Sequence, residues 1–151
     1  MNCDCIIGAL MLTTTLIGFG FTYYGIIKNR KSSQIQNILR LKKQLLDFET
    51  IHAKLLPGGE WSNPDFSLET DITNSDFSLL NAYLGFFEVC FLMINEKELT
   101  EKEFRIFLLY RLKNIFYNKS IMNYINTHPH DWHVLLKLFE KFQLKTTQTP
   151  L

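Results

Sequence analysis

Hydrophobic positions divide the chain into one long apolar run near the N-terminus and several shorter runs with helical spacing. No charged residue occurs from Cys5 to Ile27, and proline is absent there. As a helix rising 1.5 Å per residue, this run spans about 34 Å, which exceeds the roughly 30 Å of a bilayer's hydrocarbon core. We therefore predict a transmembrane helix over these residues.

The residues that flank this run predict its orientation. Only Asp4 precedes it, whereas an aromatic pair and a basic cluster lie at its C-terminal end. These residues form the expected membrane interface: Tyr23, Tyr24, Lys28, Arg30 and Lys31. Because basic residues stay on the cytoplasmic side, we expect the N-terminus outside and the remaining chain in the cytoplasm. A cleaved signal peptide has a basic start and a shorter apolar stretch, so the sequence favours an uncleaved single-pass anchor in an inner or plasma membrane.

Small residues recur along one face of the predicted span. Thr14, Gly18, Thr22 and Gly25 follow one another at steps of four, four and three residues, which places them on one side of a helix. Small side chains let two membrane helices approach closely. Homodimer formation through this face is one hypothesis, and a monomeric anchor in the lipid bilayer is the other.

An amphipathic stalk helix is predicted over residues 32–56, after a basic flank that completes the anchor region 1–31. Ser32 or Ser33 is the expected N-cap. The apolar stripe consists of Ile38, Leu41, Leu45, Phe48 and Leu55, with His52 at the remaining position. Three arrangements suit such a stripe. The helix can pack on its own domain, form a short parallel coiled coil, or lie on an anionic membrane surface.

Residues 57–75 lack helical periodicity and form a predicted acidic linker. The Pro-Gly-Gly sequence at 57–59 ends the preceding helix. Trp61 and Phe66 are apolar side chains within this acidic segment. They either fold back onto the core or dock a partner protein.

A helical domain is predicted over residues 76–143. Its first helix begins at a cap formed by Ser75 or Asp76 and ends near Ile94. One apolar stripe contains Leu80, Leu84, Phe87, Phe91 and Ile94, and a second contains Leu79, Tyr83, Phe86, Cys90 and Met93. A helix that is apolar on nearly every side is central in its domain or lies in a membrane. Because Glu88 lies in its middle, a second membrane span is not favoured.

Further helices complete this domain. Thr100 to Glu103 has the sequence of a capping box and begins a helix that ends near Tyr117. A short helix is expected around Ser120–Ile125, and Pro129 is expected in the first turn of a last helix. The inward residues are Phe104, Leu108, Leu112 and Ile115 in the first of these helices and Trp132, Leu135, Leu136, Phe139 and Phe142 in the last.

The fold class that follows is all-α, with one N-terminal transmembrane helix before a small cytoplasmic helical bundle. No alternation typical of β-strands persists along the chain. Residues 144–151 are expected to form a disordered tail.

Glu88 lies in an otherwise apolar helix and requires a physical explanation, because burying an unpaired carboxylate is costly. A short turn at 95–99 predicts that the helices on either side are antiparallel, which brings Arg105 and Arg111 opposite Glu88. A structural ion pair with one of these arginines is one hypothesis. A binding determinant that faces solvent or a partner is the other.

Charge and cysteine content add little to this picture. The net charge of +1 does not indicate nucleic-acid binding, although a basic segment at 28–54 precedes an acidic one at 57–76. Three cysteines do not form a disulfide framework. Cys90 lies in an apolar run and is expected in the core, whereas Cys3 and Cys5 are expected to be unpaired or to bridge two chains.

No arrangement of residues indicates catalysis or a cofactor. His128, His130, Asp131 and His133 are the densest group of ligand-type residues. Pro129 stiffens this segment, and the histidine spacing does not place three rings on one helical face, so helix-end roles are favoured over a metal. The chain has no glycine-rich phosphate loop and no nucleophile elbow. We therefore expect a protein that is not an enzyme and binds no cofactor.

Part of the domain resembles an uncharacterised group of bacterial single-span membrane proteins. The resemblance includes the stretch 80–88 (LNAYLGFFE), the polar turn after it, Tyr124-Ile125 and Trp132, and it covers residues 79–140. The group commonly has glycine in the turn, where this chain has Lys97. The resemblance implies an N-terminal anchor joined to a small cytosolic helical domain, and it implies no activity.

The leading functional hypothesis is a membrane-tethered module that binds another protein at the cytoplasmic face. Abundant Ile, Asn, Lys and Phe suit an AT-rich bacterial or mobile-element gene. Within this class of membrane-tethered modules, a bacterial defence or phage-related accessory protein is one hypothesis. The alternative is an effector or toxin that perturbs the membrane through its transmembrane helix. An enzyme with an unrecognised site ranks last.

Overall fold

The computed structural model describes residues 24–25, 28–29 and 31–144, which are helical or in turns and include no strand. The chain divides into two compact units, Met1–Leu39 and Arg40–Leu151. Most of the predicted transmembrane helix lies outside the described residues, together with Tyr23 and Arg30. The same holds for Thr14, Gly18 and Thr22 of the proposed dimer face, and for nearly all of the predicted tail.

In the first unit, residues 24–25, 28–29 and 31–39 are helical. Tyr24, Lys28 and Lys31 of the expected membrane interface are exposed. Ser32 and Ser33 lie within helical residues, so the prediction that one of them caps a helix was wrong. No glycine or proline separates them from Lys28, and the sequence therefore offers no reason for a helix to begin there.

The second unit begins with helical residues 40–47, a turn at Phe48, and helix α2, Glu49–Leu55. The predicted stalk is thus interrupted, and its second half belongs to the same unit as the helical domain. Phe48 packs its ring on Tyr83 and Phe86, with centroids 5.3 and 5.8 Å away. Phe48 is half-buried, and the buried residues of this segment are Leu41, Leu45, Ile51, His52 and Leu55. From Leu41 onward, the apolar stripe therefore packs on the core of its own unit.

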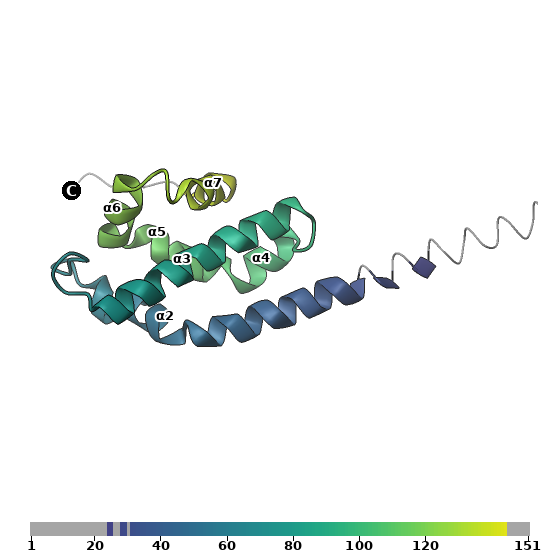
Figure 1. Ribbon diagram of the computed structural model, residues 1–151, viewed down its shortest axis with the longest axis horizontal. Coiled ribbons are helices and arrows are strands. Elements are labelled where there is room, and N and C mark those ends of the chain that lie inside the picture. Colours follow the sequence, from purple (N-terminus) through teal and green to yellow (C-terminus); the bar gives the residue numbers. More distant parts are fainter. Residues whose placement is uncertain (1–23, 26–27, 30, 145–151) are drawn as a thin grey trace, which may run out of the picture. The chain divides into compact units, whose positions relative to one another are not determined.

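The longest helix described in the second unit is α3, Asn74–Asn95, which in the view of Figure 1 runs between α7 and the helical segment that leads to α2. Its N-cap is Thr73, whose hydroxyl accepts a hydrogen bond from the Asp76 backbone N–H at 3.1 Å. The predicted helix is therefore present, but its cap lies two residues before Ser75 and three before Asp76, the two expected caps. The buried side chains of α3 come from both predicted stripes, although not every member of either stripe is buried. They are Leu80, Tyr83, Leu84, Phe86, Phe87, Cys90 and Ile94.

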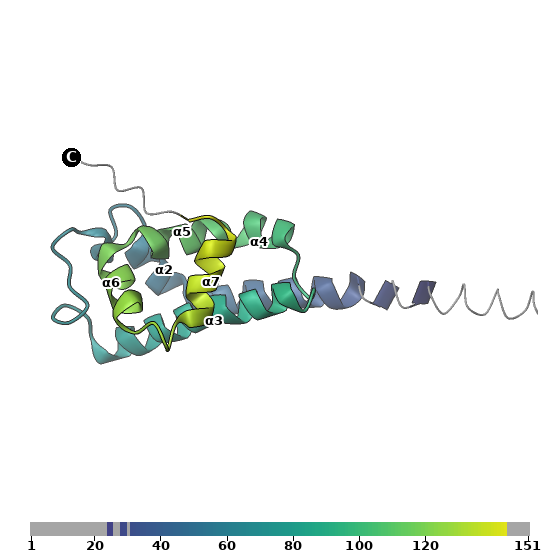
Figure 2. The ribbon, with the colours of Figure 1, turned by 90° about the horizontal axis from the view of Figure 1, so that it is seen from above.

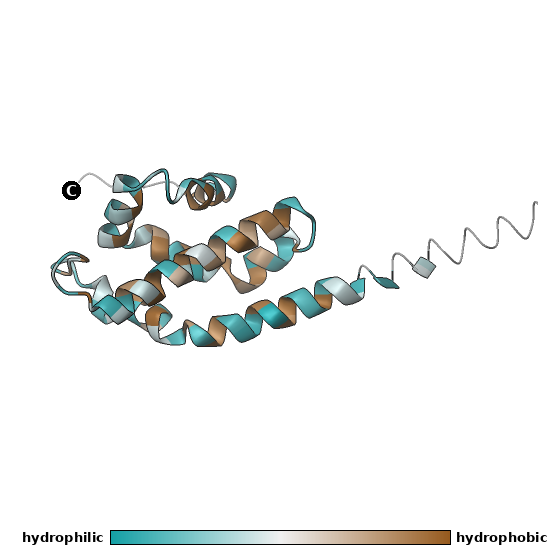
Figure 3. Ribbon diagram, viewed as in Figure 1, coloured by the Kyte–Doolittle hydropathy of each residue, from teal (hydrophilic) through white to brown (hydrophobic). Residues whose placement is uncertain are grey.

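Among the residues that the structure describes, α3 is long and apolar enough to cross a membrane, judged by length and composition alone. The central helix of a water-soluble domain meets the same criterion. Figure 3 shows that the C-terminal half of α3 is almost wholly apolar. Packing within the unit buries one side of this helix, whereas Val89 and Leu92 on another side are exposed.

The chain reverses after α3, and α4 (Glu101–Phe107) and α5 (Leu109–Tyr117) run back in the opposite sense (Figure 2). The turn contains Lys97 in the left-handed conformation with φ 60°, which glycine adopts more easily. The predicted capping box of Thr100 and Glu103 is confirmed. Leu108 separates two helices where one was predicted, and the four residues expected to face inward are all buried.

Helix α6, Lys119–Thr127, begins at Asn118, whose side chain accepts from the Ile121 backbone N–H. Helix α7 spans His133–Lys141 and crosses α3 (Figures 1 and 2). It packs more extensively on α3 than on any other helix. Pro129 precedes α7 instead of lying in its first turn. Most residues predicted to face inward are buried: Trp132, Leu135, Phe139 and Phe142.

The segment between α2 and α3 folds against the second unit. It contains the short helix η1, Glu60–Ser62, and buries Trp61 and Phe66, whose rings stack with centroids 5.5 Å apart. The Asn118 side chain donates to the Trp61 carbonyl at 2.6 Å, and the Ser120 hydroxyl donates to the Phe66 carbonyl. The predicted linker is therefore part of the folded unit.

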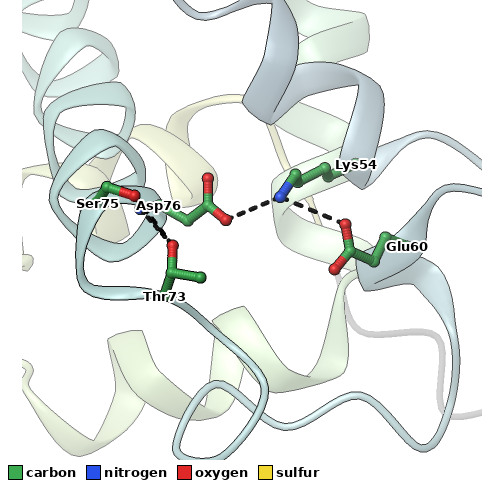
Figure 4. A network of polar contacts seen from close by, with 5 residues as sticks. All are labelled: Lys54, Glu60, Thr73, Ser75 and Asp76. Carbon is green, nitrogen blue, oxygen red and sulfur yellow. Dashed lines mark hydrogen bonds and ion pairs between the residues drawn. The ribbon is translucent and has the colours of Figure 1, made fainter.

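A polar network joins this segment to both neighbouring helices (Figure 4). The Lys54 ammonium of α2 lies 2.8 Å from the Asp76 carboxylate of α3 and 3.3 Å from Glu60 of η1. The hydrogen bond with Lys54 holds the pKa of Asp76 below its ordinary value. Lys54 therefore links the end of α2 to the start of α3.

Candidate interaction surface

One side of α3 carries apolar residues that the described part of the second unit leaves uncovered. Ala82, Gly85, Val89 and Leu92 follow one another at steps of three, four and three residues, so they share a face. Val89 is 51% exposed and Leu92 is 53% exposed. We call these four residues the outer face of α3. Isolated exposed apolar residues are ordinary, but a contiguous row along one helix marks an interaction site.

A groove of about 320 Å³ lies next to this face. Its lining comes from the helical segment before α2 and from α3: Gln44, Asp47, Phe48, Ala82, Gly85, Phe86 and Val89. A Cβ placed on Gly85 would meet no atom within 4 Å, so packing inside the unit does not require glycine there. Glycine instead leaves backbone open at the groove, where another helix can approach closely.

The groove combines an apolar floor with a polar edge. Phe86 is buried beneath it, whereas Gln44 and Asp47 are exposed at one side. Such a surface suits an amphipathic helix, because apolar side chains anchor the helix and the carboxylate selects a cation beside them.

Two polar contacts join α2 to α3 and α5 within the second unit and have a structural role. The buried Tyr83 hydroxyl lies 3.3 Å from His52 Nδ1, and the Arg111 guanidinium pairs with Glu49 at 2.7 Å. Burial lowers the pKa of His52, with a smaller contribution from Arg111. The buried His52 ring of α2 therefore packs against Tyr83 of α3 and Tyr110 of α5.

The predicted pairing of Glu88 with Arg105 or Arg111 was wrong. Arg111 pairs with Glu49, and the Arg105 guanidinium lies 4.9 Å from the centroid of the Phe142 ring. Glu88 is half-buried, and its Oε1 accepts a hydrogen bond from the Leu135 backbone N–H at 3.1 Å. The Glu88 carboxylate of α3 thus accepts from a backbone N–H in the first turn of α7 that has no acceptor within its own helix. The dipole of α7 also favours negative charge at this end.

Burial raises the pKa of the Glu88 carboxyl, and backbone hydrogen bonds from Leu135 and Val134 oppose this shift. A carboxyl with a raised pKa in the folded state lowers the free energy of unfolding as pH rises from its unfolded pKa through the folded one. Glu88→Gln removes this titration and keeps an acceptor for Leu135. We expect its stability relative to wild type to increase as pH rises above the ordinary pKa of a glutamate carboxyl, and to stay within about 1 kcal/mol of wild type.

Glu88→Ala is the matched variant for this prediction. It leaves the buried Leu135 N–H without its acceptor and is expected to lower the free energy of unfolding by about 1–3 kcal/mol. Urea titration of the full chain in detergent micelles at several pH values measures both variants. Equal losses for Gln and Ala at neutral pH would show that Glu88 acts as a charge and not as an acceptor.

Other residues predicted for a site have structural positions. Trp61 and Phe66 are buried, so their side chains are not available to dock a partner. His128 Nδ1 lies 3.0 Å from the Tyr124 carbonyl, and His133 Nδ1 lies 3.2 Å from the His130 carbonyl. Within the described ranges, no three His, Cys, Asp or Glu side chains are grouped for a metal ion.

The outer face of α3 was not distinguished by the sequence analysis. The sequence predicts a helix that is apolar on nearly every side, in which Ala82 and Gly85 are smaller than the bulky residues of the two predicted stripes. Small residues repeating at helical spacing were the available signal.

No protein-family model matches the chain, and no curated protein or solved structure is significantly similar to it.

Proposed function

We propose that this protein is a membrane-tethered helical module that binds another protein at the cytoplasmic face. The observation that carries this proposal is the uncovered outer face of α3 beside the groove at Gly85. The tether is the predicted single-pass helix Cys5–Ile27, with the second unit on the cytoplasmic side. Tethering raises the local concentration of the module at the membrane, which strengthens binding without further contacts.

The partner that best fits this surface is an amphipathic helix. Small or apolar side chains on one stripe of that helix would pack along Ala82, Gly85, Val89 and Leu92. A basic residue on its edge would complement Asp47, which is exposed at the side of the groove. In this pairing, close contact between the two helices at Gly85 contributes affinity. The ion pair with Asp47 fixes the orientation of the bound helix.

Photocrosslinking in cells tests this proposal. A benzoyl-phenylalanine at Val89 of the full chain is expected to form one discrete adduct, and Leu92→Glu is expected to abolish it. Central apolar contacts of an interface typically contribute 2 kcal/mol or more, so the loss of binding should be roughly thirtyfold or greater. The same crosslinker at Tyr117, an exposed aromatic residue of α5, is the control and should give no such adduct.

Two results would contradict the proposal. An adduct with a second copy of this chain would assign the face to self-association. Growth arrest with membrane depolarisation upon expression, abolished by removing residues 1–31 and unaffected by Leu92→Glu, would favour the membrane-perturbing effector.

A further inference from the structure

A second exposed surface, distinct from the outer face of α3, combines lysines with apolar and aromatic side chains. Its members come from helical residues 40–47 and from α4 and α5: Lys42, Leu46, Ile106, Phe107, Tyr110 and Lys113. We call these six residues the basic aromatic patch. Leu46 is 72% exposed, Ile106 is 63% exposed and Tyr110 is 59% exposed.

Side-chain contacts bring the two parts of the patch together. Lys42 Nζ lies 4.4 Å from the centroid of the Phe107 ring. One turn further along, the ring of Tyr110 meets His52 edge-on with centroids 6.0 Å apart. Leu46 follows Lys42 by one helical turn and therefore lies on the same side of its helix. The contact of Lys42 with Phe107 therefore places helical residues 40–47 beside the end of α4, and the exposed members of the patch come from these neighbouring helices.

This patch and the groove lie on different sides of the same helical segment. Lys42 belongs to the patch and Gln44 lines the groove, and residues two apart are about 200° apart around a helix. One surface can therefore be occupied while the other remains open.

The charge around the patch is basic. The chain has no Asp or Glu from Phe104 to His130, and none from Arg40 to Leu46. Glu49 pairs with Arg111, Glu101 pairs with Lys141, and Glu103 is held in the capping box with Thr100. Asp47 follows Leu46 directly, but it comes five residues after Lys42 and therefore lies about 140° from it around the helix, on the side of the groove.

This combination matches the interfacial region of an anionic bilayer. Lysines at a surface are attracted to acidic headgroups, tyrosine is favoured at headgroup level, and leucine, isoleucine and phenylalanine enter the boundary with the acyl chains. Nucleic acid fits less well, because its affinity depends on many phosphate contacts and the patch offers two lysines amid apolar side chains.

We propose that the basic aromatic patch rests on the anionic leaflet, so that the second unit lies against the membrane on this face. The proposal goes beyond the proposed function, because it assigns a different surface and a lipid ligand. With the patch on the bilayer, the groove on the other side of the helical segment is left for the protein partner.

Lipid quenching of a fluorescent label tests this in the full chain reconstituted into nanodiscs. A bimane label is attached at Ile106→Cys or, as control, at Lys137→Cys, which is exposed on α7. Cys3 and Cys5 are replaced by serine, whereas Cys90 is buried and is kept. Nanodiscs contain spin-labelled lipid in neutral phosphatidylcholine, or in phosphatidylcholine with about one third phosphatidylglycerol.

We expect quenching at position 106 in the anionic nanodiscs, weak quenching in the neutral ones, and weak quenching at 137 in both. The double substitution Lys42→Glu and Lys113→Glu should reduce quenching at 106 to the neutral level, and about 1 M salt should weaken it. Equal urea midpoints for all variants confirm that folding is unchanged.

Equal quenching at 106 and 137, or quenching that does not depend on anionic lipid, would overturn the proposal. A labelled oligonucleotide that binds at physiological salt, and less tightly after the two lysine substitutions, would assign the patch to nucleic acid instead. Resistance to alkaline carbonate extraction reports the predicted anchor separately. Failure of the tether is thereby distinguished from failure of the patch.

Discussion

Phe87→Ala is expected to lower the free energy of unfolding of the second unit by about 3–5 kcal/mol, because it leaves a large cavity at the centre of α3. Phe87 is completely buried. Its ring meets those of Tyr83, Phe86 and Phe104 edge-on, with centroids 5.2, 5.4 and 6.4 Å away. Urea titration of the full chain in detergent micelles, followed by helical circular dichroism, measures the loss.

Val89→Ala is the matched control on the same helix. Val89 lies two residues along, on the outer face of α3, and packs on little of the described structure. Surface substitutions of this kind change stability by about 0.5 kcal/mol or less. Similar losses for both variants would contradict the distinction between a buried and an uncovered side of α3, and would remove the basis for the proposed partner surface.

Helix positions in the second unit were largely predictable because local signals agree with tertiary packing. The capping box at Thr100 and the three- and four-residue spacing of apolar residues in α3 are local signals. Each predicts a helix whatever the other helices of the unit do. The interruptions at Phe48 and Leu108 were not predictable. Neither site carries glycine or proline, and at Phe48 the break accompanies packing of the ring on Tyr83 and Phe86.

The position of Glu88 shows why the candidate site was predicted less well than the fold. The sequence indicated that Glu88 needs a partner, and it indicated an antiparallel neighbour that contains arginines. It did not indicate that α7, which follows much later in the chain, packs across α3 and presents the Leu135 N–H. Which helix covers which side depends on loop paths, and these leave little trace in hydrophobic spacing.

The outer face of α3 has a similar explanation. From residue 79 to residue 94 of this helix, only Asn81 and Glu88 are polar, so hydropathy gives little amphipathic contrast from which a covered and an uncovered side can be inferred. Only the arrangement of the other helices leaves Val89 and Leu92 exposed. Apolar residues at a binding surface and apolar residues in the core have the same hydropathy. Only their exposure in the folded structure distinguishes them.

Trp61→Ala is expected to lower the free energy of unfolding by about 3–5 kcal/mol, comparable to the loss for Phe87, although Trp61 lies in a segment of irregular structure. The side chain is buried and stacks on Phe66, and the Lys54 ammonium lies 5.3 Å from its ring centroid. Its loss removes the apolar contact that holds the 57–73 segment against the unit.

Trp61→Phe preserves an aromatic ring for this stacking and is expected to retain most of the stability. The Asn118 hydrogen bond is accepted by the backbone carbonyl of residue 61, so it is present in all three proteins and does not account for their difference. Urea titration gives the free energies, and hydrogen exchange locates the change, with the largest loss of protection expected at 57–73 and at the start of α6. If Trp61→Ala keeps wild-type stability while the crosslinked adduct at Val89 disappears, Trp61 contributes to partner binding and its burial is not needed for the fold.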